Sequence, residues 1–166
     1  MAVQKIKITV RDFGEMIAEL YEDKAPLTVK NFLSLVDRGF YEGLIFHRVI
    51  SGFMIQGGGY DESFEDRDAD AIRGEFAANG FVRNDLKHKR GVLSMARTGD
   101  PDSASSQFFI MHRDAPHLDA QYAGFGCVVE GLDVVDRIAA VPTGRMGYFS
   151  DVPRMPVVIE KIERVD

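Results

Sequence analysis

The chain has 166 residues, of which 45% are hydrophobic and 28% charged, so its composition predicts one globular domain spanning residues 1–166. Its formal net charge of −6 argues against a nucleic-acid partner, because binding to phosphates needs a clustered excess of Lys and Arg. No apolar run approaches the roughly 18 residues that span a bilayer, and no signal peptide is visible after Met1. We therefore expect a cytoplasmic protein with no membrane partner.

The first quarter of the chain predicts a hairpin followed by a helix. Residues 4–10 alternate between polar and apolar side chains, and residues 15–21 do so again after a turn, which is typical of paired strands with one solvated face. From Pro26 the apolar spacing changes to three and four, which predicts an amphipathic helix of about a dozen residues. Pro26 suits the first turn of this helix, and Gly39 suits the left-handed position beyond its end.

The middle of the chain contains short apolar segments between polar loops. Residues 91–96 and 107–111 have the composition of buried strands, and the polar residues 98–106 between them predict a loop. Residues 60–90 show no clear period. A loop of that length in a compact domain is usually functional or wraps a core.

The last third predicts a strand, a helix and a final strand. The strand covers residues 122–129, the helix 131–140 and the final strand 157–162, with a proline- and glycine-containing loop through residues 142–156. The only cysteine, Cys127, lies in the first of these strands and is expected to be a buried thiol. Seven or eight short strands with one early and one late helix favour a closed antiparallel barrel or a sandwich, with the helices over its ends.

Residues 46–59, FHRVISGFMIQGGG, stand out as an apolar stretch that contains one cation, Arg48, and one amide, Gln56. Taken alone, Arg48 has two interpretations: a surface cation beside apolar residues, or part of a ligand site. The second apolar segment, residues 107–111, begins with Gln107, and two such strands side by side would form a shallow apolar groove with polar edges. Ligand sites have that composition, which favours the second interpretation.

Other chemistries are not supported by the sequence. His112 and His117 are the only close pair of histidines, and no Cys or carboxylate joins them at a zinc-binding spacing, so we expect no metal. The G-x-S-x-G motif of a hydrolase is absent, and the glycines at 57–59 match neither phosphate-binding motif. These glycines are better explained by tight turning behind a strand, and no cofactor is expected.

Three segments together resemble the signature of the cyclophilins, which are peptidyl-prolyl cis-trans isomerases. They are FHRVISGFMIQGG, RGVLSMAR and SQFFI, in this order and at matching separations, and the resemblance covers nearly the whole chain. The compact segment 38–43 and the sequence ARTGDPDSASSQ are more similar to the short, single-domain bacterial members. The resemblance implies an eight-stranded antiparallel barrel closed by two helices, with the active groove on its outer surface.

The resemblance also implies roles for individual residues. Arg48 matches the catalytic Arg of the family, and Gln56 matches the residue that helps to hold this Arg and contacts the substrate backbone. The socket for the proline ring would consist of four side chains, Phe53, Met54, Phe109 and Leu118. The other matched binding positions are Ala96 and Arg97, which would pair with the peptide backbone, then Gln107, His117 and Tyr122. Rotation about a peptide bond needs a hydrogen-bond donor and no base, so His47 is expected to be structural.

Three of these positions depart from the better-known eukaryotic pattern. His117 replaces a Trp, Tyr122 replaces a His and Arg97 replaces an Asn. The missing indole contributes to the binding of the cyclic peptide cyclosporin, so we expect cyclosporin to bind more weakly while catalysis is retained. Tyr122 keeps an aromatic face with a polar tip that can still close the pocket.

We therefore predict a peptidyl-prolyl cis-trans isomerase that acts on proline-containing polypeptides. Two alternatives are a module that binds proline peptides with little turnover and a chaperone whose isomerase activity is incidental. The loop at 98–106 borders the groove in this interpretation, and is either a determinant of substrate preference or a plain solvated connection. A monomer is expected, because no surplus apolar helix face is evident.

Overall fold

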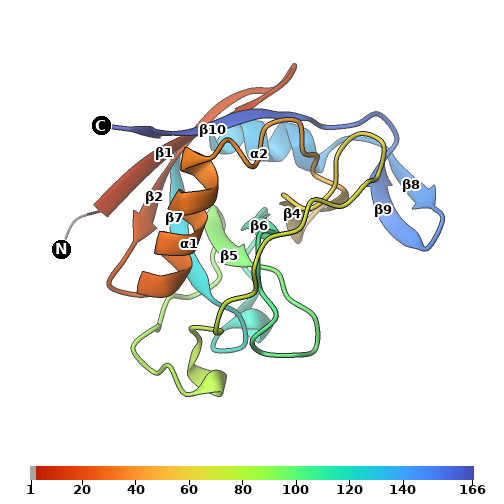
Figure 1. Cartoon of the computed structure of the whole chain (residues 1–166). Coiled ribbons are helices and arrows are strands. Elements are labelled where there is room, and N and C mark those ends of the chain that lie inside the picture. Colours follow the sequence, from red (N-terminus) through yellow and green to blue (C-terminus); the bar gives the residue numbers. More distant parts are fainter. Residues whose placement is uncertain (1–2) are drawn as a thin grey trace.

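The computed structural model describes residues 3–166, so the first two residues of the predicted 1–166 domain lie outside the described range. The chain alternates between strands and two α-helices (Figure 1). In chain order the elements are β1 (Val3–Val10), β2 (Gly14–Tyr21), α1 (Pro26–Asp37), β3 (Arg48–Ile50), β4 (Met54–Gly57), the 3₁₀-helix η1 (Ala77–Asn79), β5 (Val92–Met95), β6 (Phe108–Met111), the 3₁₀-helix η2 (Pro116–Leu118), β7 (Gly124–Glu130), α2 (Leu132–Ala139), β8 (Thr143–Met146), β9 (Phe149–Pro153) and β10 (Ile159–Val165).

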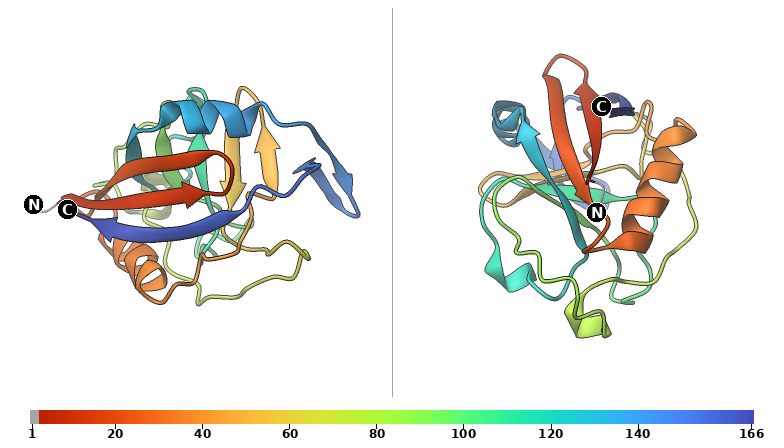
Figure 2. Two further views of the ribbon diagram at one scale, coloured as in Figure 1. Left: turned by 90° about the horizontal axis from the view of Figure 1, so that it is seen from above. Right: turned by 90° about the vertical axis from the view of Figure 1, so that its left-hand side faces the viewer.

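Within residues 3–166, eight strands form one antiparallel sheet in the order β10-β1-β2-β7-β5-β6-β4-β3. The sheet curls strongly, so that β1, β2 and β10 lie across the molecule from the shorter strands (Figure 2). The outermost strands, β10 and β3, do not pair with each other, although Ile45 and Val158 just before them form an isolated bridge. The predicted mainly β fold with two helices is confirmed, whereas the predicted closure is not: the sheet is an open half-barrel.

The predicted loop at 142–156 is wrong, because most of it forms a second, two-stranded sheet of β8 and β9. Gly147 supplies the positive φ of 60° that the tight connection between these strands requires. Pro142 precedes β8 and Pro153 ends β9, and strand ends are the positions where a missing N–H is tolerated. The hairpin extends away from the large sheet (Figures 1 and 2).

The two predicted helices are present, and α1 begins at Pro26 as expected. Gly39 follows this helix with a φ of 69°, the left-handed conformation that favours glycine. At the other end Ala25 offers no side-chain cap. The buried carboxylate of Glu75 replaces the cap, since it accepts the N–H groups of Leu27 (3.1 Å) and Thr28 (2.6 Å).

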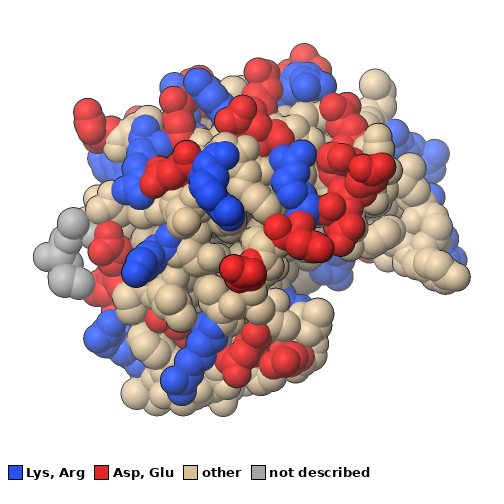
Figure 3. Space-filling model, in the orientation of Figure 1, with Lys and Arg blue, Asp and Glu red and all other residues tan. Residues whose placement is uncertain are grey.

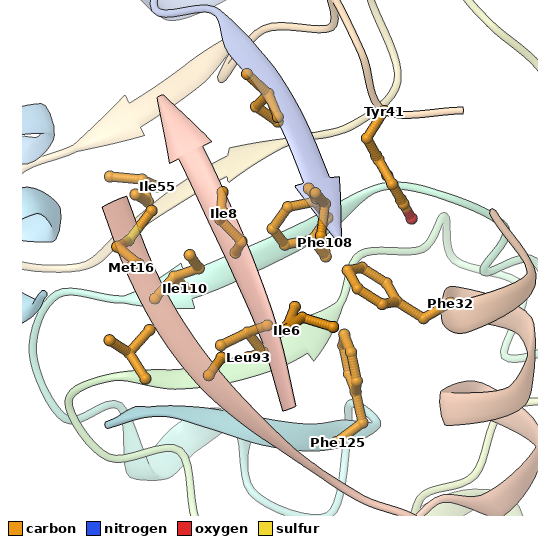
Figure 4. Packing of buried hydrophobic residues seen from close by; sticks show 14 of the residues in the cluster. Ile6, Ile8, Met16, Phe32, Tyr41, Ile55, Leu93, Phe108, Ile110 and Phe125 are labelled. Atoms are coloured by element: carbon orange, nitrogen blue, oxygen red, sulfur yellow. The ribbon is translucent and has the colours of Figure 1, made fainter. Parts of the chain in front are cut away.

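The core lies inside the curl of the sheet, where Phe32 of α1 packs against Phe108 and Phe125 (Figure 4). Consecutive residues of β6 point to opposite faces of the sheet, so Phe108 joins this core while Phe109 joins a second apolar cluster on the other face. Both faces of β6 are therefore covered. This explains why residues 108–111 form a continuous apolar run rather than an alternating one.

The surface carries charges of both signs, which are interspersed on the face shown in Figure 3. In the described part of the chain, no helix combines the length and the apolar character needed to cross a membrane.

Candidate active site

The hairpin of β3 and β4 places Arg48 and Gln56 opposite each other in the antiparallel register. Arg48 Nη1 donates a hydrogen bond to Gln56 Oε1 (3.2 Å), and Gln56 Nε2 donates in turn to Gln107 Oε1 (3.1 Å). The other N–H groups of Arg48 have no protein acceptor within residues 3–166, and the side chain lines a pocket. This relay therefore holds the guanidinium at the pocket and leaves its other N–H groups without a protein acceptor in the described residues.

The pocket beside Arg48 has an apolar floor and a volume of about 140 Å³. The floor is built from Met54 of β4, Phe109 of β6 and Leu118 of η2, all of which belong to the second apolar cluster. Phe53, from the turn between β3 and β4, packs against the same cluster. The volume suits one small ring, because pockets for drug-sized ligands measure about 300–1,000 Å³.

Arg97, Tyr122 and Ala96 also line the pocket. The Arg97 guanidinium lies over two aromatic rings, 4.8 Å from the centroid of Phe76 and 4.7 Å from that of Tyr122. It also donates hydrogen bonds to the carbonyl oxygens of Gln121 (2.8 Å) and Thr98 (2.9 Å). These contacts hold the long side chain in place.

The structure brings together nine of the eleven predicted site residues around this pocket. They are Arg48, Phe53, Met54, Gln56, Ala96, Arg97, Phe109, Leu118 and Tyr122. Gln107 lies in an adjoining pocket of about 200 Å³, which shares Gln56, Ala96 and Arg97 with the first and is completed by Thr98, Ser103 and Ser105. His117 is exposed and stacks on Phe53, with ring centroids 5.8 Å apart.

The glycines at 57–59 allow close packing as well as turning. A Cβ on Gly57 would come within 2.5 Å of the Ile45 carbonyl oxygen, and one on Gly59 within 2.5 Å of the Gln107 side chain. Only Gly58 has a positive φ, of 91°. The interpretation as turn residues was therefore incomplete: Gly59 also makes room for the amide that supports Gln56.

His47 lies beside Arg48 in sequence but outside the pocket. Its ring is buried between Tyr60 (centroids 4.8 Å apart) and Phe149 (6.0 Å), and Nδ1 has no hydrogen-bond partner within residues 3–166. Burial, together with the positive charge of Arg48, lowers the pKa of His47 to about 4. The imidazole is therefore neutral at physiological pH and packs as part of the protein interior.

Comparison with known proteins identifies the family. The profile described as "Cyclophilin type peptidyl-prolyl cis-trans isomerase/CLD" matches residues 5–164. The chain belongs to the cyclophilins. This cyclophilin is 47% identical to a peptidyl-prolyl cis-trans isomerase of Acinetobacter baylyi, over 92% of this chain and 81% of the relative. It is 44% identical to peptidyl-prolyl cis-trans isomerase B of Escherichia coli, over 90% and 93% of the two chains.

A solved structure of a Cryptosporidium parvum cyclophilin is similar over 99% of both chains, with a TM-score of 0.85 and 29% identity. A second structure of that protein, in the presence of the dipeptide Ala-Pro, has a TM-score of 0.83 to this cyclophilin and 29% identity, over 98% of this chain and 99% of the other.

Sequence reasoning missed two buried histidines near the pocket of this cyclophilin. The ring of His88 stacks on Phe109 (centroids 6.1 Å apart), and its nitrogens lie 2.8 Å from Ser94 Oγ and 3.1 Å from Asp119 Oδ1. Burial lowers the pKa of His88, although Asp119 opposes the shift. His112, considered above only as a metal ligand, contacts the turn that contains Phe53.

No sequence signal could have revealed these pairings, because the partners are distant in the chain.

No group of three or more metal-binding side chains occurs in the described residues. Cys127 is half-buried rather than fully buried, and burial raises the pKa of its thiol.

Proposed function

We propose that the pocket binds the proline ring of a polypeptide and that Arg48 catalyses rotation about the preceding peptide bond. The observation that supports this most directly is the Arg48 guanidinium, which Gln56 holds beside a small pocket with an apolar floor. An apolar ring would occupy the floor formed by Met54, Phe109 and Leu118, and the bond that rotates would lie beside the cation.

Catalysis of this rotation needs selective binding of the twisted state. A peptide bond has a rotation barrier of about 18–20 kcal/mol because twisting removes the amide resonance. Shortening an isomerisation from about 100 s to about 1 ms requires a rate increase of about five powers of ten. This increase corresponds to about 7 kcal/mol of transition-state stabilisation. As the bond twists, the lone pair of the prolyl nitrogen localises, so a donor directed at this nitrogen binds the twisted state more strongly than either planar state.

Arg48 suits this task because its planar guanidinium carries several N–H donors and can donate to the nitrogen while Gln56 holds it. No proton changes hands and no covalent bond forms, so the reaction needs neither a base nor a cofactor. Gln56 and Gln107 would bind the substrate backbone, and the groove would continue into the adjoining pocket next to Ala96 and Arg97.

The proposed ligands are proline-containing polypeptides, including unfolded chains. The structure of the C. parvum cyclophilin with Ala-Pro supports this chemical class. Cyclosporin is expected to bind weakly, because the exposed imidazole of His117 replaces a larger indole. We also propose that residues 1–166 form a single domain, that the protein is a monomer and that it is located in the cytoplasm.

An isomerisation assay on a proline tetrapeptide tests the function. Arg48→Ala should lower kcat/KM by about two to three powers of ten, the usual loss when a donor to the transition state is removed. Arg48→Lys keeps the charge but not the planar arrangement of donors, and should recover only part of the rate. Arg145→Ala, on the exposed hairpin of β8 and β9, serves as the matched control and should leave the rate unchanged.

Assays of peptide binding and of aggregation on the same proteins separate the alternatives. A wild-type protein that binds the peptide without accelerating isomerisation would be a binding module. A protein whose suppression of aggregation survives Arg48→Ala would have a chaperone function that does not depend on isomerisation. Equal rates for the wild type and Arg48→Ala would refute the role of Arg48.

A further inference from the structure

The turn between β3 and β4, residues 51–53, is fastened to His112 by hydrogen bonds in both directions. The backbone N–H of Gly52 donates to His112 Nδ1 (2.9 Å), and the backbone N–H of His112 donates to the carbonyl oxygen of Phe53 (2.9 Å). Gly52 is itself exposed and has a φ of 80°, whereas His112 is buried, with 7% of its surface exposed. The imidazole is thus the fixed partner, and the turn is the part that it holds.

These contacts require one form of the imidazole. A backbone N–H can only donate, so Nδ1 of His112 must be unprotonated and its ring proton must lie on Nε2. Nε2 is 3.2 Å from Asp136 Oδ1 of α2, so the proton on Nε2 faces a carboxylate. Asp136 is in turn held by Arg90, whose two terminal nitrogens lie 2.6 and 2.9 Å from its oxygens. The neutral ring therefore accepts a hydrogen bond at Nδ1 and faces a carboxylate at Nε2.

The charged groups around His112 come from three parts of the chain. They are Asp136 on α2, Arg90 before β5 and Arg113 on the loop after β6, while the turn at 51–53 contributes no charge. Burial is the main cause that lowers the pKa of His112, Arg113 and Arg90 lower it further, and Asp136 opposes them. The surroundings therefore favour the neutral ring that the geometry requires.

The turn matters because Phe53 forms part of the pocket wall. Both backbone polar groups of Phe53 are hydrogen-bonded. Its carbonyl oxygen accepts from the N–H of His112, and its own N–H donates to the carbonyl oxygen of Ile50 (3.0 Å). The Phe53 ring packs against the apolar cluster of the pocket and stacks on His117. Any movement of the turn would therefore displace the ring that contacts the bound proline.

We propose that His112 is a positioning residue, which fixes Phe53 in the wall of the proline pocket and does so only as the neutral imidazole. This inference rests on the proposed function. Protonation would place a second N–H donor on Nδ1, facing the N–H of Gly52. Two donors cannot bond, so the turn is released on that side and substrate affinity falls, while the contact of Arg48 with the twisted bond is unaffected.

Two variants of His112 separate the hydrogen bond from mere packing. The amide oxygen of His112→Asn can occupy the position of Nδ1 and accept from Gly52 without titrating. His112→Gln places its amide near the position of Nε2, where it can meet Asp136, and leaves the Gly52 N–H without an acceptor. The assay is NMR exchange on a proline tetrapeptide, which gives kcat and KM between pH 5 and pH 7.5 without a coupling protease.

At pH 7.5, His112→Gln should raise KM about fivefold, the effect expected for one lost hydrogen bond, with kcat unchanged. His112→Asn should restore KM to near the wild-type value. On acidification the KM of the wild type should rise, and the KM of His112→Asn should stay level. Both variants are checked for folding by circular dichroism.

A KM for His112→Gln equal to that of the wild type would overturn the inference. If His112→Gln does not fold, the pH profile of His112→Asn decides, since a rise in KM as large as in the wild type would also overturn it. An inactive wild type would instead refute the proposed function. An active wild type that Arg48→Ala inactivates and His112→Gln leaves unchanged would refute only the role of His112.

Discussion

His47 should make the protein sensitive to acid, because its buried ring stays neutral where an exposed histidine would be protonated. The folded pKa is about 4, against an ordinary value of 6.5. At pH values between these two pKa values, His47 is protonated in the unfolded chain and neutral in the folded chain. The free energy of unfolding therefore falls as the pH falls. Between pH 7.5 and pH 4.5, the shift corresponds to a loss of about 2.5 kcal/mol.

The perturbation that isolates this effect is His47→Leu. An apolar side chain can replace the ring without depriving another group of a hydrogen bond to Nδ1, since that nitrogen has no partner in the described residues. Unfolding in urea, followed by circular dichroism at both pH values, gives the loss of stability for each protein. Contributions from His88, His112 and the carboxylates are common to both proteins and cancel in the difference.

We expect the loss on acidification to be about 2.5 kcal/mol smaller for His47→Leu than for the wild type. The folded variant should keep a kcat/KM close to that of the wild type, because the reaction moves no proton. Equal losses in the two proteins would show that His47 is protonated in the folded state and would refute the reasoning.

Three further predictions concern stability and binding. Glu75→Gln should lower the free energy of unfolding by about 1–3 kcal/mol, because Glu75 accepts three hydrogen bonds at the start of α1, and urea unfolding measures the loss. Phe109→Ala should cost about 3–5 kcal/mol and raise KM, since this side chain is 5% exposed; a stability loss below about 1 kcal/mol would contradict its place in the floor. Inhibition by cyclosporin should be weak and should tighten in His117→Trp; tight inhibition of the wild type would oppose this expectation.

Much of the fold follows from local patterns. The alternation in residues 4–10 and 15–21 predicted the first hairpin, and Pro26 and Gly39 marked the start and the end of α1 to within two residues. The hairpin of β8 and β9 was missed because three prolines and two glycines are spread through residues 142–156, which is typical of a loop. Its pairing depends on Gly147 and on proline positions at the strand ends, which a composition rule does not distinguish.

The parts of the candidate site that lie in recognisable local sequence segments were predictable. The contacts between residues far apart in the sequence were not. Arg48 lies in β3, Gln56 lies in β4, and Gln107 directly precedes β6. These segments have distinctive apolar sequences, so the grouping of the three residues could be expected. The contact of His112 with Asp136 joins a loop to a helix, and that of Arg97 with Phe76 joins two irregular segments. Such pairs are set by the tertiary path of the chain, which leaves no local periodicity to detect.

The opposite orientation of Phe108 and Phe109 has a consequence for engineering. Strand β6 contributes side chains to the protein core on one face and to the floor of the pocket on the other. A mutant library that varies β6 would therefore alter folding and ligand affinity together. The rim is different at residues 98–106, which connect β5 to β6 without belonging to the sheet. Selection for new sequence preferences should therefore find its tolerated changes in this loop, while Phe108 and Phe109 are kept unchanged.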